Sequence, residues 1–312
     1  MEWLAGIIAL VVASIAGMFP AHMLAYQAAP LVHQQKAVVL FGGDMLFDRS
    51  VRTAIVEKGG DYIFSCIDSV LDDADMVIAN LEGPITSTSS KSAGSAVGGK
   101  NNYTFTFATS TAALLARHNI RIVNIGNNHI LNFGAWGLDE TKRYLDAAGV
   151  GYFGDSMIYH TVVNGVPLAF INYNEFAPIE HTNVLGYVSM SSTTVRQIRE
   201  ARAAGKLPVV YTHWGIEYAT TSSAYSRELA HSFIDAGAEV VIGSHPHVVE
   251  EHETYNGKNI YYSLGNFIFD QYWNDDVRNG LLLRVEFSAS GVRSLREIPI
   301  RLQQDRRTCP VR

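Results

Sequence analysis

Short apolar runs rich in β-branched residues alternate along most of this chain with segments in which apolar residues recur every three or four positions. The runs predict buried strands, over residues 37–42, 76–79, 103–107, 120–125, near Val162, 168–173, 207–212, 239–242, 260–263 and 281–287. The recurring segments predict helices, over residues 62–74, 112–118, 137–148, 192–204 and 224–236. Such an alternation is typical of an α/β domain, and the Ser- and Gly-rich residues 87–100 predict a mobile surface loop.

The first 35 residues follow a different pattern. From Trp3 to Gln35 the chain has no Asp, Glu, Lys or Arg, and its most apolar part, 3–19, suits a signal sequence or a membrane anchor. We therefore expect a signal or anchor segment over 1–35, an α/β domain over 36–300 and a C-terminal tail over 301–312. An apolar helix that anchors the protein in the cell membrane, with the domain outside the cytoplasm, is favoured over secretion after cleavage.

Composition narrows the function classes. The formal net charge is −6 and no dense basic run occurs, which argues against a nucleic-acid-binding protein. The two cysteines, Cys66 and Cys309, lie far apart, neither has metal-ligand spacing, and nothing in the sequence supports a disulfide between them.

Polar residues follow five of the predicted strands directly. Because ligand sites of α/β proteins form at the carboxyl ends of strands, we expect these residues to meet in one place. The candidate metal ligands are Asp44, Glu82, Asn128, His213, His245 and His247. Each motif taken alone is commonly a turn, a helix cap or an ordinary histidine. The coincidence at five strand ends favours a site.

This donor set predicts one or two divalent ions. Two carboxylates, one amide oxygen and three imidazoles suit Mn, Fe or Zn better than Ca or Mg. Pro246 restricts His245 toward an extended backbone, which would let His245 and His247 project to the same side. Two divalent ions against two carboxylates leave two positive charges, which would attract an anionic group and lower the pKa of bound water. His129, next to Asn128, is placed to protonate a leaving group.

Three further residues are candidates for substrate binding. Trp214 and Tyr218 follow His213 and could line a pocket, although aromatic residues after a strand more often serve packing. Arg49 could hold an anion near Asp44, although a plain surface position is the ordinary alternative.

The order of these motifs resembles the CapA/PgsA family of bacterial capsule and poly-γ-glutamate biosynthesis proteins. The resemblance runs from about Val38 to Asp270, on the segments Gly43-Asp44-Met45, Asn80-Leu81-Glu82-Gly83-Pro84, Asn127-Asn128-His129, His213-Trp214-Gly215, Gly243-Ser244-His245-Pro246-His247 and Gly265-Asn266-Phe267. That family is similar to the calcineurin-like metallophosphoesterases. The resemblance implies a two-sheet α/β sandwich flanked by helices, with a dinuclear metal site.

The resemblance also implies a role for each ligand candidate. Asp44 and His247 would bind one ion, Glu82 would bridge, and Asn128, His213 and His245 would bind the second, with His129 as acid or transition-state group. The chain departs from the pattern in three places. Leu46 replaces the histidine of an Asp-x-His motif, Asn132 an aspartate, and Glu250 a glutamine.

Three functions follow as hypotheses. The leading one is a capsule-type, poly-γ-glutamate-like polymer biosynthesis protein with a metal-dependent, metallophosphoesterase-like hydrolase site. It would act at the cell envelope on an anionic polymer or its carrier. The second is a metal-dependent phosphoesterase that acts on an envelope metabolite. The third is a non-catalytic accessory subunit that binds the polymer or a membrane synthase complex.

Overall fold

The computed structural model describes residues 35–92, 102–176 and 186–311, which form one compact unit. The predicted signal or anchor segment lies outside the described residues. Within the described ranges, no helix has both the length and the apolar character needed to cross a membrane.

Eight strands form the first sheet, in the order β14-β13-β12-β1-β2-β3-β4, with β11 beside β1. Their bounds are β1 (Ala37–Met45), β2 (Met76–Leu81), β3 (Ile120–Asn124), β4 (Gly151–Phe153), β11 (Asn266–Ile268), β12 (Asn279–Ser288), β13 (Gly291–Leu302) and β14 (Thr308–Pro310). Strands β1 to β4 run parallel, whereas β12, β13 and β14 pair antiparallel. The parallel half therefore directs its carboxyl ends to one edge.

Six strands form the second sheet, in the order β5-β6-β7-β8-β10-β9. Their bounds are β5 (Tyr159–Val163), β6 (Val166–Asn174), β7 (Leu207–His213), β8 (Val240–Ser244), β9 (His252–Tyr255) and β10 (Lys258–Tyr261). The central strands β6, β7, β8 and β10 run parallel. Strands β6, β7 and β8 are buried along nearly their whole length, which explains their nearly continuous apolar sequences.

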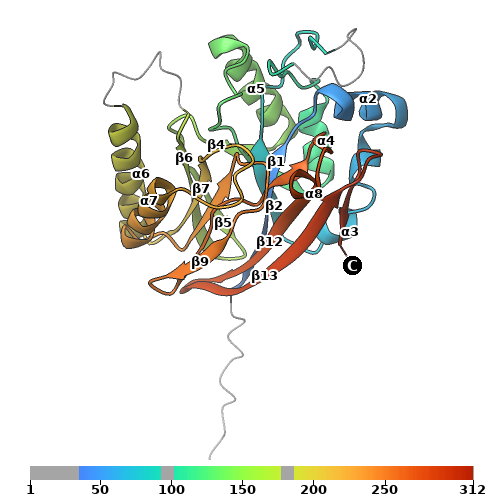
Figure 1. The fold of residues 1–312 in the computed structure, drawn as a ribbon. Coiled ribbons are helices and arrows are strands. Elements are labelled where there is room, and N and C mark those ends of the chain that lie inside the picture. Colours follow the sequence, from blue (N-terminus) through green and yellow to red (C-terminus); the bar gives the residue numbers. More distant parts are fainter. Residues whose placement is uncertain (1–34, 93–101, 177–185, 312) are drawn as a thin grey trace, which may run out of the picture. The chain divides into compact units, whose positions relative to one another are not determined.

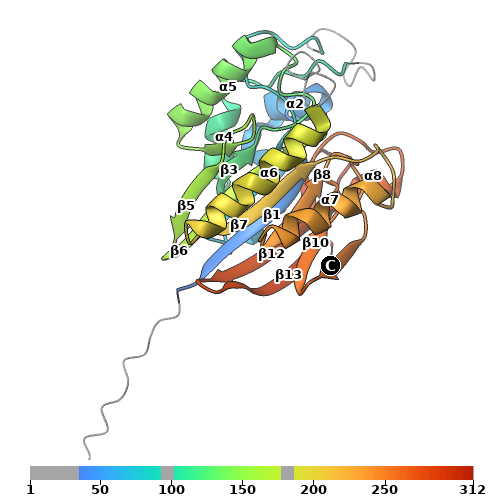
Figure 2. The ribbon, with the colours of Figure 1, turned by 90° about the vertical axis from the view of Figure 1, so that its left-hand side faces the viewer.

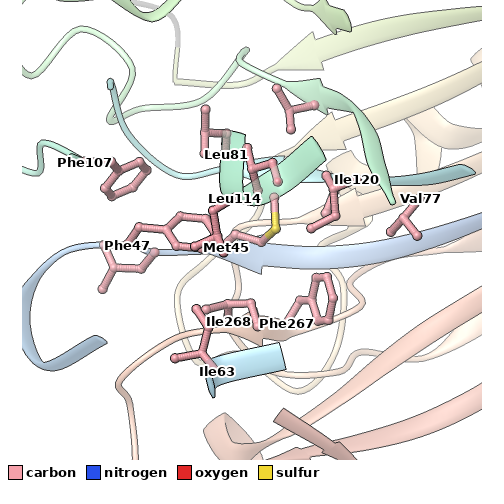
Figure 3. Packing of buried hydrophobic residues seen from close by; sticks show 14 of the residues in the cluster. Met45, Phe47, Ile63, Val77, Leu81, Phe107, Leu114, Ile120, Phe267 and Ile268 are labelled. Atoms are coloured by element: carbon pink, nitrogen blue, oxygen red, sulfur yellow. The ribbon is translucent and has the colours of Figure 1, made fainter. Parts of the chain in front are cut away.

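The two sheets pack face to face and helices cover their outer faces (Figures 1 and 2). Successive residues of β1 serve different layers, as the pleat of a strand requires. Val39 and Phe41 belong to the core between the sheets, whereas Leu40 belongs to the core beneath the helices that follow the strands of this sheet. Met45 lies in that second core as well, because the register of β1 shifts between Phe41 and Asp44 (Figure 3). The predicted two-sheet α/β sandwich is confirmed.

The helices divide between the two outer faces. Those that follow strands of the first sheet are α2 (Arg49–Lys58), the 3₁₀ helix η1 (Gly60–Phe64), α3 (Asp68–Leu71), α4 (Thr111–Arg117) and α5 (Gly134–Ala148). Helices α6 (Gly186–Ala203) and α7 (Ala224–Asp235) cover the second sheet, and α8 (Asp275–Arg278) precedes β12 (Figure 2). Gly149 ends α5 in the left-handed conformation that is common at helix C-termini.

Several elements differ from the sequence-based expectation. The helix predicted over 62–74 is divided into η1 and α3, and the strand predicted over 103–107 reduces to a single bridge between Ile85 and Phe107. The long strand β13 was not predicted. Its apolar residues are interrupted by charged ones, and it forms because it pairs along its length with β12.

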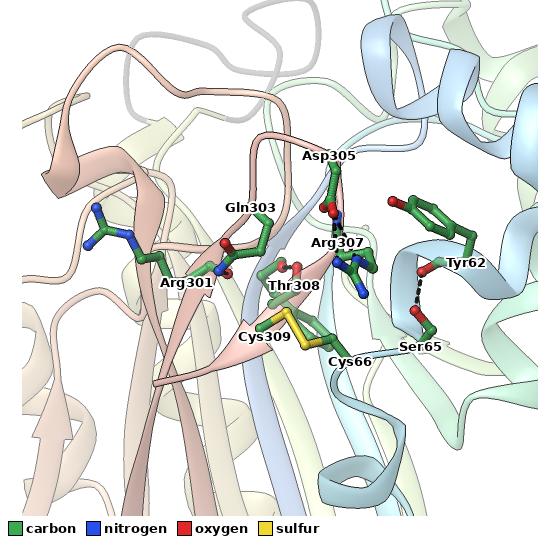
Figure 4. The surroundings of a disulfide bond; sticks show 10 residues. Tyr62, Ser65, Cys66, Arg301, Gln303, Asp305, Arg307, Thr308 and Cys309 are labelled. Carbon is green, nitrogen blue, oxygen red and sulfur yellow. Dashed lines mark hydrogen bonds and ion pairs between the residues drawn. A yellow bond between two sulfur atoms is a disulfide. The ribbon is translucent and has the colours of Figure 1, made fainter. Parts of the chain in front are cut away.

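The C-terminal residues belong to the domain, so the expected separate tail is wrong. Strand β13 runs to Leu302, and β14 pairs with it. Cys309 in β14 forms a disulfide with Cys66, which lies between η1 and α3 (Figure 4). The sequence offered no support for this bond because 243 residues separate the cysteines and only the folded sheet brings them together.

The described part of the predicted mobile loop, residues 87–92, is anchored. Ser90 Oγ and Ser92 Oγ donate hydrogen bonds of 2.5 and 2.6 Å to Asp48 Oδ1, and both serines are buried. The backbone N–H of Thr106 donates to the other carboxylate oxygen at 3.1 Å. Asp48 therefore connects this loop to the start of α2. The rest of the predicted loop lies outside the described residues.

Candidate metal centre

The carboxyl ends of the parallel strands of both sheets meet at one edge. Tyr211 in β7 donates a hydrogen bond of 2.6 Å to the Gly42 carbonyl in β1, so the sheets are joined beside the site. Asn172 Nδ2 in β6 likewise donates to the carbonyl of Gly126 after β3, at 3.2 Å. These bonds hold side chains from the two sheets within reach of one another.

Asn80 is the side chain that connects the candidate ligands of the first sheet, a role that was not predicted. Its amide Nδ2 lies 2.8 Å from Asp44 Oδ1 and 3.3 Å from His213 Nδ1, and it also donates to Glu82 Oε2. Its Oδ1 accepts from Asn127 Nδ2 at 3.0 Å. The available signal was the two-residue spacing from Glu82, which places both on one face of the chain.

Glu82, His213 and His245 form a buried cluster whose donor atoms lie within 4.8 Å of one another. His213 Nε2 is 3.5 Å from Glu82 Oε1, 3.2 Å from His245 Nδ1 and 2.9 Å from Asn128 Oδ1. Glu82 Oε1 has no hydrogen-bond partner among the described residues. A buried carboxylate oxygen without a hydrogen bond destabilises the fold by at least about 1–3 kcal/mol. A divalent cation would satisfy it, so the cluster fits a metal ion.

Asp44 and His247 lie beside this cluster. Asp44 Oδ2 is 3.3 Å from His247 Nδ1 and accepts from the backbone N–H of His245 at 3.1 Å. Asn266 Oδ1 contacts His247 Nδ1 at 3.0 Å. All six candidate ligands therefore form one connected group.

The backbone at the two histidines differs from the expectation. His245 and His247 adopt φ values of 99° and 60°, so His245 is not extended before Pro246 as predicted. Positive φ is costly for residues other than glycine, about 1–3 kcal/mol each, and is found where the surroundings impose it, often at functional sites. Here Asp44 accepts from the strained backbone of His245 and contacts His247, and thus helps to hold the turn.

The two carboxylates ionise differently. Burial raises the pKa of Glu82 well above its ordinary value, and the charge of Asp44 adds to the effect. Burial also opposes ionisation of Asp44, but the hydrogen bond and charge of His247 outweigh it and lower the pKa of Asp44. Two close carboxylates resist simultaneous ionisation. A divalent cation between them would favour the ionised form of both.

The imidazoles of the cluster are held in their neutral form. Burial lowers the pKa of His213 well below its ordinary value, with the charge of His245 as a second cause. Burial also lowers the pKa of His245, to about 3. Neutral imidazole is the form that binds metal ions.

His129 lies at the edge of the group and is oriented by Asn132. Asn132 Oδ1 accepts from the backbone N–H of Phe105 at 2.7 Å, which fixes the amide orientation, and contacts His129 Nδ1 at 3.2 Å. The bond therefore places the ring proton on Nδ1. Burial lowers the pKa of His129 to about 4. The amide thus orients the ring as an aspartate would, but without its charge.

The three predicted substrate-binding residues occupy different environments. Trp214 is completely buried, and its Nε1 donates to the carbonyl of Tyr262 at 2.9 Å, so the expectation that it lines a pocket does not fit. Tyr218 is 43% exposed, and its ring lies 6.2 Å from that of His247. Arg49 has only 9% of its side chain exposed, which excludes the surface position given as the ordinary alternative.

Leu46 is also buried, in the core beneath the helices of the first sheet. At this position, where a related pattern would have a histidine, the side chain offers no ligand atom, and the backbone N–H donates to the carbonyl of Ile268 at 2.7 Å.

The fold and the site define an α/β sandwich with a buried cluster of carboxylates and imidazoles at the strand ends, and sequence comparison places it in a family. The chain belongs to the family of the bacterial capsule synthesis protein PGA_cap, whose model matches residues 38–271. This confirms the resemblance inferred from the motifs and nearly coincides with its predicted extent.

Three relatives support the assignment. The chain is 31% identical over 277 residues to the PGA biosynthesis protein CapA of Bacillus subtilis, which covers 85% of this chain and 71% of that protein. It is 29% identical over 294 residues to the capsule biosynthesis protein CapA of Bacillus anthracis, covering 88% and 70%. A relative from Mycobacterium tuberculosis, named a probable polyglutamine synthesis accessory protein, is 26% identical over 58% of this chain and 56% of its own.

Proposed function

We propose that the protein takes part in the biosynthesis of a capsule-type, poly-γ-glutamate-like polymer through a metal-dependent hydrolytic centre that acts outside the cytoplasm. The observation that carries the proposal is the buried Glu82–His213–His245 cluster. Its Glu82 Oε1 accepts no hydrogen bond from the described part of the chain and faces imidazoles held neutral. The names of the Bacillus relatives support the choice of polymer.

The contacts suggest how the ligands divide. Glu82, His213, His245 and Asn128 would hold one ion firmly, because their donor atoms already converge. Asp44 and His247 would hold a second ion more loosely with Glu82 as a bridge, since Leu46 supplies no ligand. A bound divalent ion supplies Lewis acidity and makes water a better nucleophile near neutral pH. Mn, Fe and Zn all suit the donor set.

His129 would move the proton. With the ring neutral at pH 7 and its proton held on Nδ1 by Asn132, Nε2 is a proton acceptor. We assign Nε2 the task of taking a proton from the attacking water and returning it to the leaving group. This refines the expectation of a simple acid.

The disulfide supports action outside the cytoplasm. Disulfides such as Cys66–Cys309 persist in oxidising compartments and are rare in the cytosol. The uncharged apolar residues 3–19 agree with an anchor, with cleavage and secretion as the alternative. Partners would then be the anionic polymer or its carrier and a membrane synthase complex.

A non-catalytic accessory role is the second candidate. It is favoured by buried Leu46, which leaves the first motif without a histidine ligand, and by the accessory name of the mycobacterial relative. A phosphoesterase that acts on an envelope metabolite would use the same metal centre as the leading proposal. Hydrolysis tests with the two kinds of substrate distinguish these two functions.

Metal analysis and turnover test the proposal together. The full-length protein, loaded with Mn and gently dialysed, is expected to keep more than zero and fewer than two equivalents. His245→Ala should lose the firmly held ion, whereas His129→Ala should keep it and lose hydrolysis of a γ-glutamyl oligomer. Hydrolysis of an aryl phosphodiester instead would favour the phosphoesterase. No metal after Mn loading would contradict both enzymatic roles, and a membrane partner captured equally by His129→Ala would favour the accessory role.

A further inference from the structure

Arg49 combines features that an ordinary structural arginine lacks. It is the first residue of α2 and adopts φ 51°, which is strained for a residue with a side chain. Its guanidinium carbon lies 5.1 Å from the ring centroid of Phe105 and 5.7 Å from that of Phe269. Its Nε is buried and has no hydrogen-bond partner among the described residues. The guanidinium is thus held between two rings with donor capacity left over.

Asp270 holds the guanidinium from one side. Arg49 Nη2 donates to Asp270 Oδ1 at 2.5 Å, while the backbone N–H and hydroxyl of Ser50 donate to Oδ2 at 3.3 and 3.2 Å. Both carboxylate oxygens therefore have partners, and Arg306 Nε in turn donates to Ser50 Oγ at 2.9 Å. A buried ion pair gives little net stability, because desolvation offsets the attraction. Stability alone therefore does not explain why the arginine is placed here.

The same two rings connect Arg49 to the candidate metal centre. The ring of Phe105 lies 4.4 Å from that of His129, and the ring of Phe269 lies 4.7 Å from that of His247. The charge of Arg49 also influences the pKa of two residues at the site, His129 and Tyr218. Burial is the main cause that lowers the pKa of His129, and Arg49 adds to it; burial raises the pKa of Tyr218, and Arg49 opposes it.

We propose that Arg49 binds an anionic oxygen of the substrate, from a carboxylate or a phosphoryl group, beside the metal centre, and that Asp270 is its positioning residue. The proposal rests on the proposed function and names the substrate feature read by the same site. A planar guanidinium matches both kinds of anion through paired donors. Because the Arg49 side chain is only 9% exposed and its guanidinium lies near the rings of Phe105 and Phe269, it binds an anion more strongly than an exposed arginine would.

Binding of two small anions tests the proposal without requiring turnover. Inorganic phosphate and glutarate are titrated calorimetrically into the Mn-loaded, full-length protein. Arg49→Lys is expected to weaken at least one of them about tenfold, and Arg49→Gln more, with Mn content unchanged. A loss confined to phosphate identifies the phosphoryl group, and a loss confined to glutarate the carboxylate. Arg293→Gln, an exposed arginine of β13 that pairs with Glu286, is the matched control and should bind both anions normally.

Asp270 has its own readout. Asp270→Asn should weaken the same anion that Arg49→Lys weakens, by a smaller factor, and Asp270→Glu should recover part of the loss. A purely structural role would instead lower stability and leave the affinity of the folded protein unchanged.

Affinities for both anions that are unchanged in Arg49→Lys and Arg49→Gln would overturn the proposal. Failure of the proposal that Arg49 binds an anion is distinguishable from failure of the proposed function. If the protein binds no metal or hydrolyses nothing, the same titrations on the metal-free protein still report whether Arg49 binds an anion.

Discussion

Asn132 determines how His129 can act, because it supplies the orientation of an acidic partner without the charge. Its Oδ1 is fixed by the backbone of Phe105, so it accepts from His129 Nδ1. Burial remains the largest influence on the ring and lowers its pKa to about 4. A carboxylate at the same place would favour the protonated imidazole.

Asn132→Asp should therefore raise the pKa of His129 by about 1–2 units. The proton then leaves the ring at higher pH, and the acid limb of any activity profile should move to higher pH with it. Nuclear magnetic resonance titration of the ring protons measures the shift, with the exposed and remote His252 as internal reference. An unchanged His129 pKa would mean that Asn132 does not orient the ring.

Glu250 gives a second prediction, on stability. Burial raises its pKa to about 8, with the charge of Glu251 as a further cause. In the unfolded chain the carboxyl ionises near 4.5, so between pH 4.5 and 8 the folded state binds more protons and the free energy of unfolding falls as pH rises. Glu250→Gln should remove this fall and be more stable than the parent at pH 8, by roughly 1–3 kcal/mol.

Denaturant unfolding at pH 5 and pH 8 tests this prediction. Glu228→Gln, on the exposed face of α7, is the control. It should change the free energy of unfolding by the same small amount at pH 5 and at pH 8. If the difference in free energy of unfolding between the parent and Glu250→Gln does not increase from pH 5 to pH 8, the argument from burial is wrong.

Single residues also show where sequence reasoning fails. The ligand candidates were predictable because each follows an apolar strand, and strand ends converge. The burial of Arg49 was not predictable, because it depends on Phe105 and Phe269, which come from distant parts of the chain. The burial of Trp214 agrees with packing, the role that aromatic residues after a strand more often have.

Among the elements, β1 packs very closely against its neighbours beside the candidate centre. Its pairing with β2 shifts register between Phe41 and Asp44, and a Cβ added to Gly43 would lie 1.8 Å from the carbonyl oxygen of Gly265. That oxygen also accepts from the backbone N–H of Asp44 at 3.0 Å. Only glycine allows β1 to approach this closely and still place Asp44.

Gly43→Ala should therefore destabilise the fold by at least about 3 kcal/mol and weaken Mn binding. The control is Gly205→Ala. Gly205 has φ 72°, and a Cβ added there would meet none of the described residues within 4 Å. This substitution should therefore cost only the backbone strain, about 1–2 kcal/mol, and leave Mn binding intact. Thermal unfolding and metal analysis measure both. Equal effects of the two substitutions would show that close approach at Gly43 is unimportant.

The elements differ in how far their own residues predict them. Strands β1, β2, β3, β7 and β8 were predictable because burial on both faces demands apolar runs. Strand β13 was not predictable, because its pairing with β12 decides it rather than local periodicity. The break between η1 and α3 was not predictable either; it contains Cys66, whose disulfide partner is 243 residues away.

For the whole molecule, the Cys66–Cys309 bond closes nearly the full length of the domain. Removing a cross-link over 243 residues should lower the free energy of unfolding by about 5 kcal/mol in the loop-entropy treatment, and by 2–5 kcal/mol for typical native disulfides. The double variant Cys66→Ser, Cys309→Ser should show this loss, and dithiothreitol should reproduce it in the parent protein.

Denaturant unfolding with and without the reductant measures the effect, and the double variant itself should not respond to dithiothreitol. Equal stability of oxidised and reduced parent protein would mean that the bond does not form. The parent protein and the double variant should bind similar amounts of metal, because the candidate ligands lie apart from the cysteines in the chain.

The position of β1 has a consequence for how the protein matures. This strand is the first of the domain, yet one of its neighbours, β12, begins only at residue 279, and the candidate centre draws on residues from 44 to 247. A nascent polypeptide cannot close the first sheet until nearly all of it has been synthesised. Capture of the proposed metal ion would therefore be a late event, and the compartment in which the finished polypeptide folds would determine which cation the centre receives.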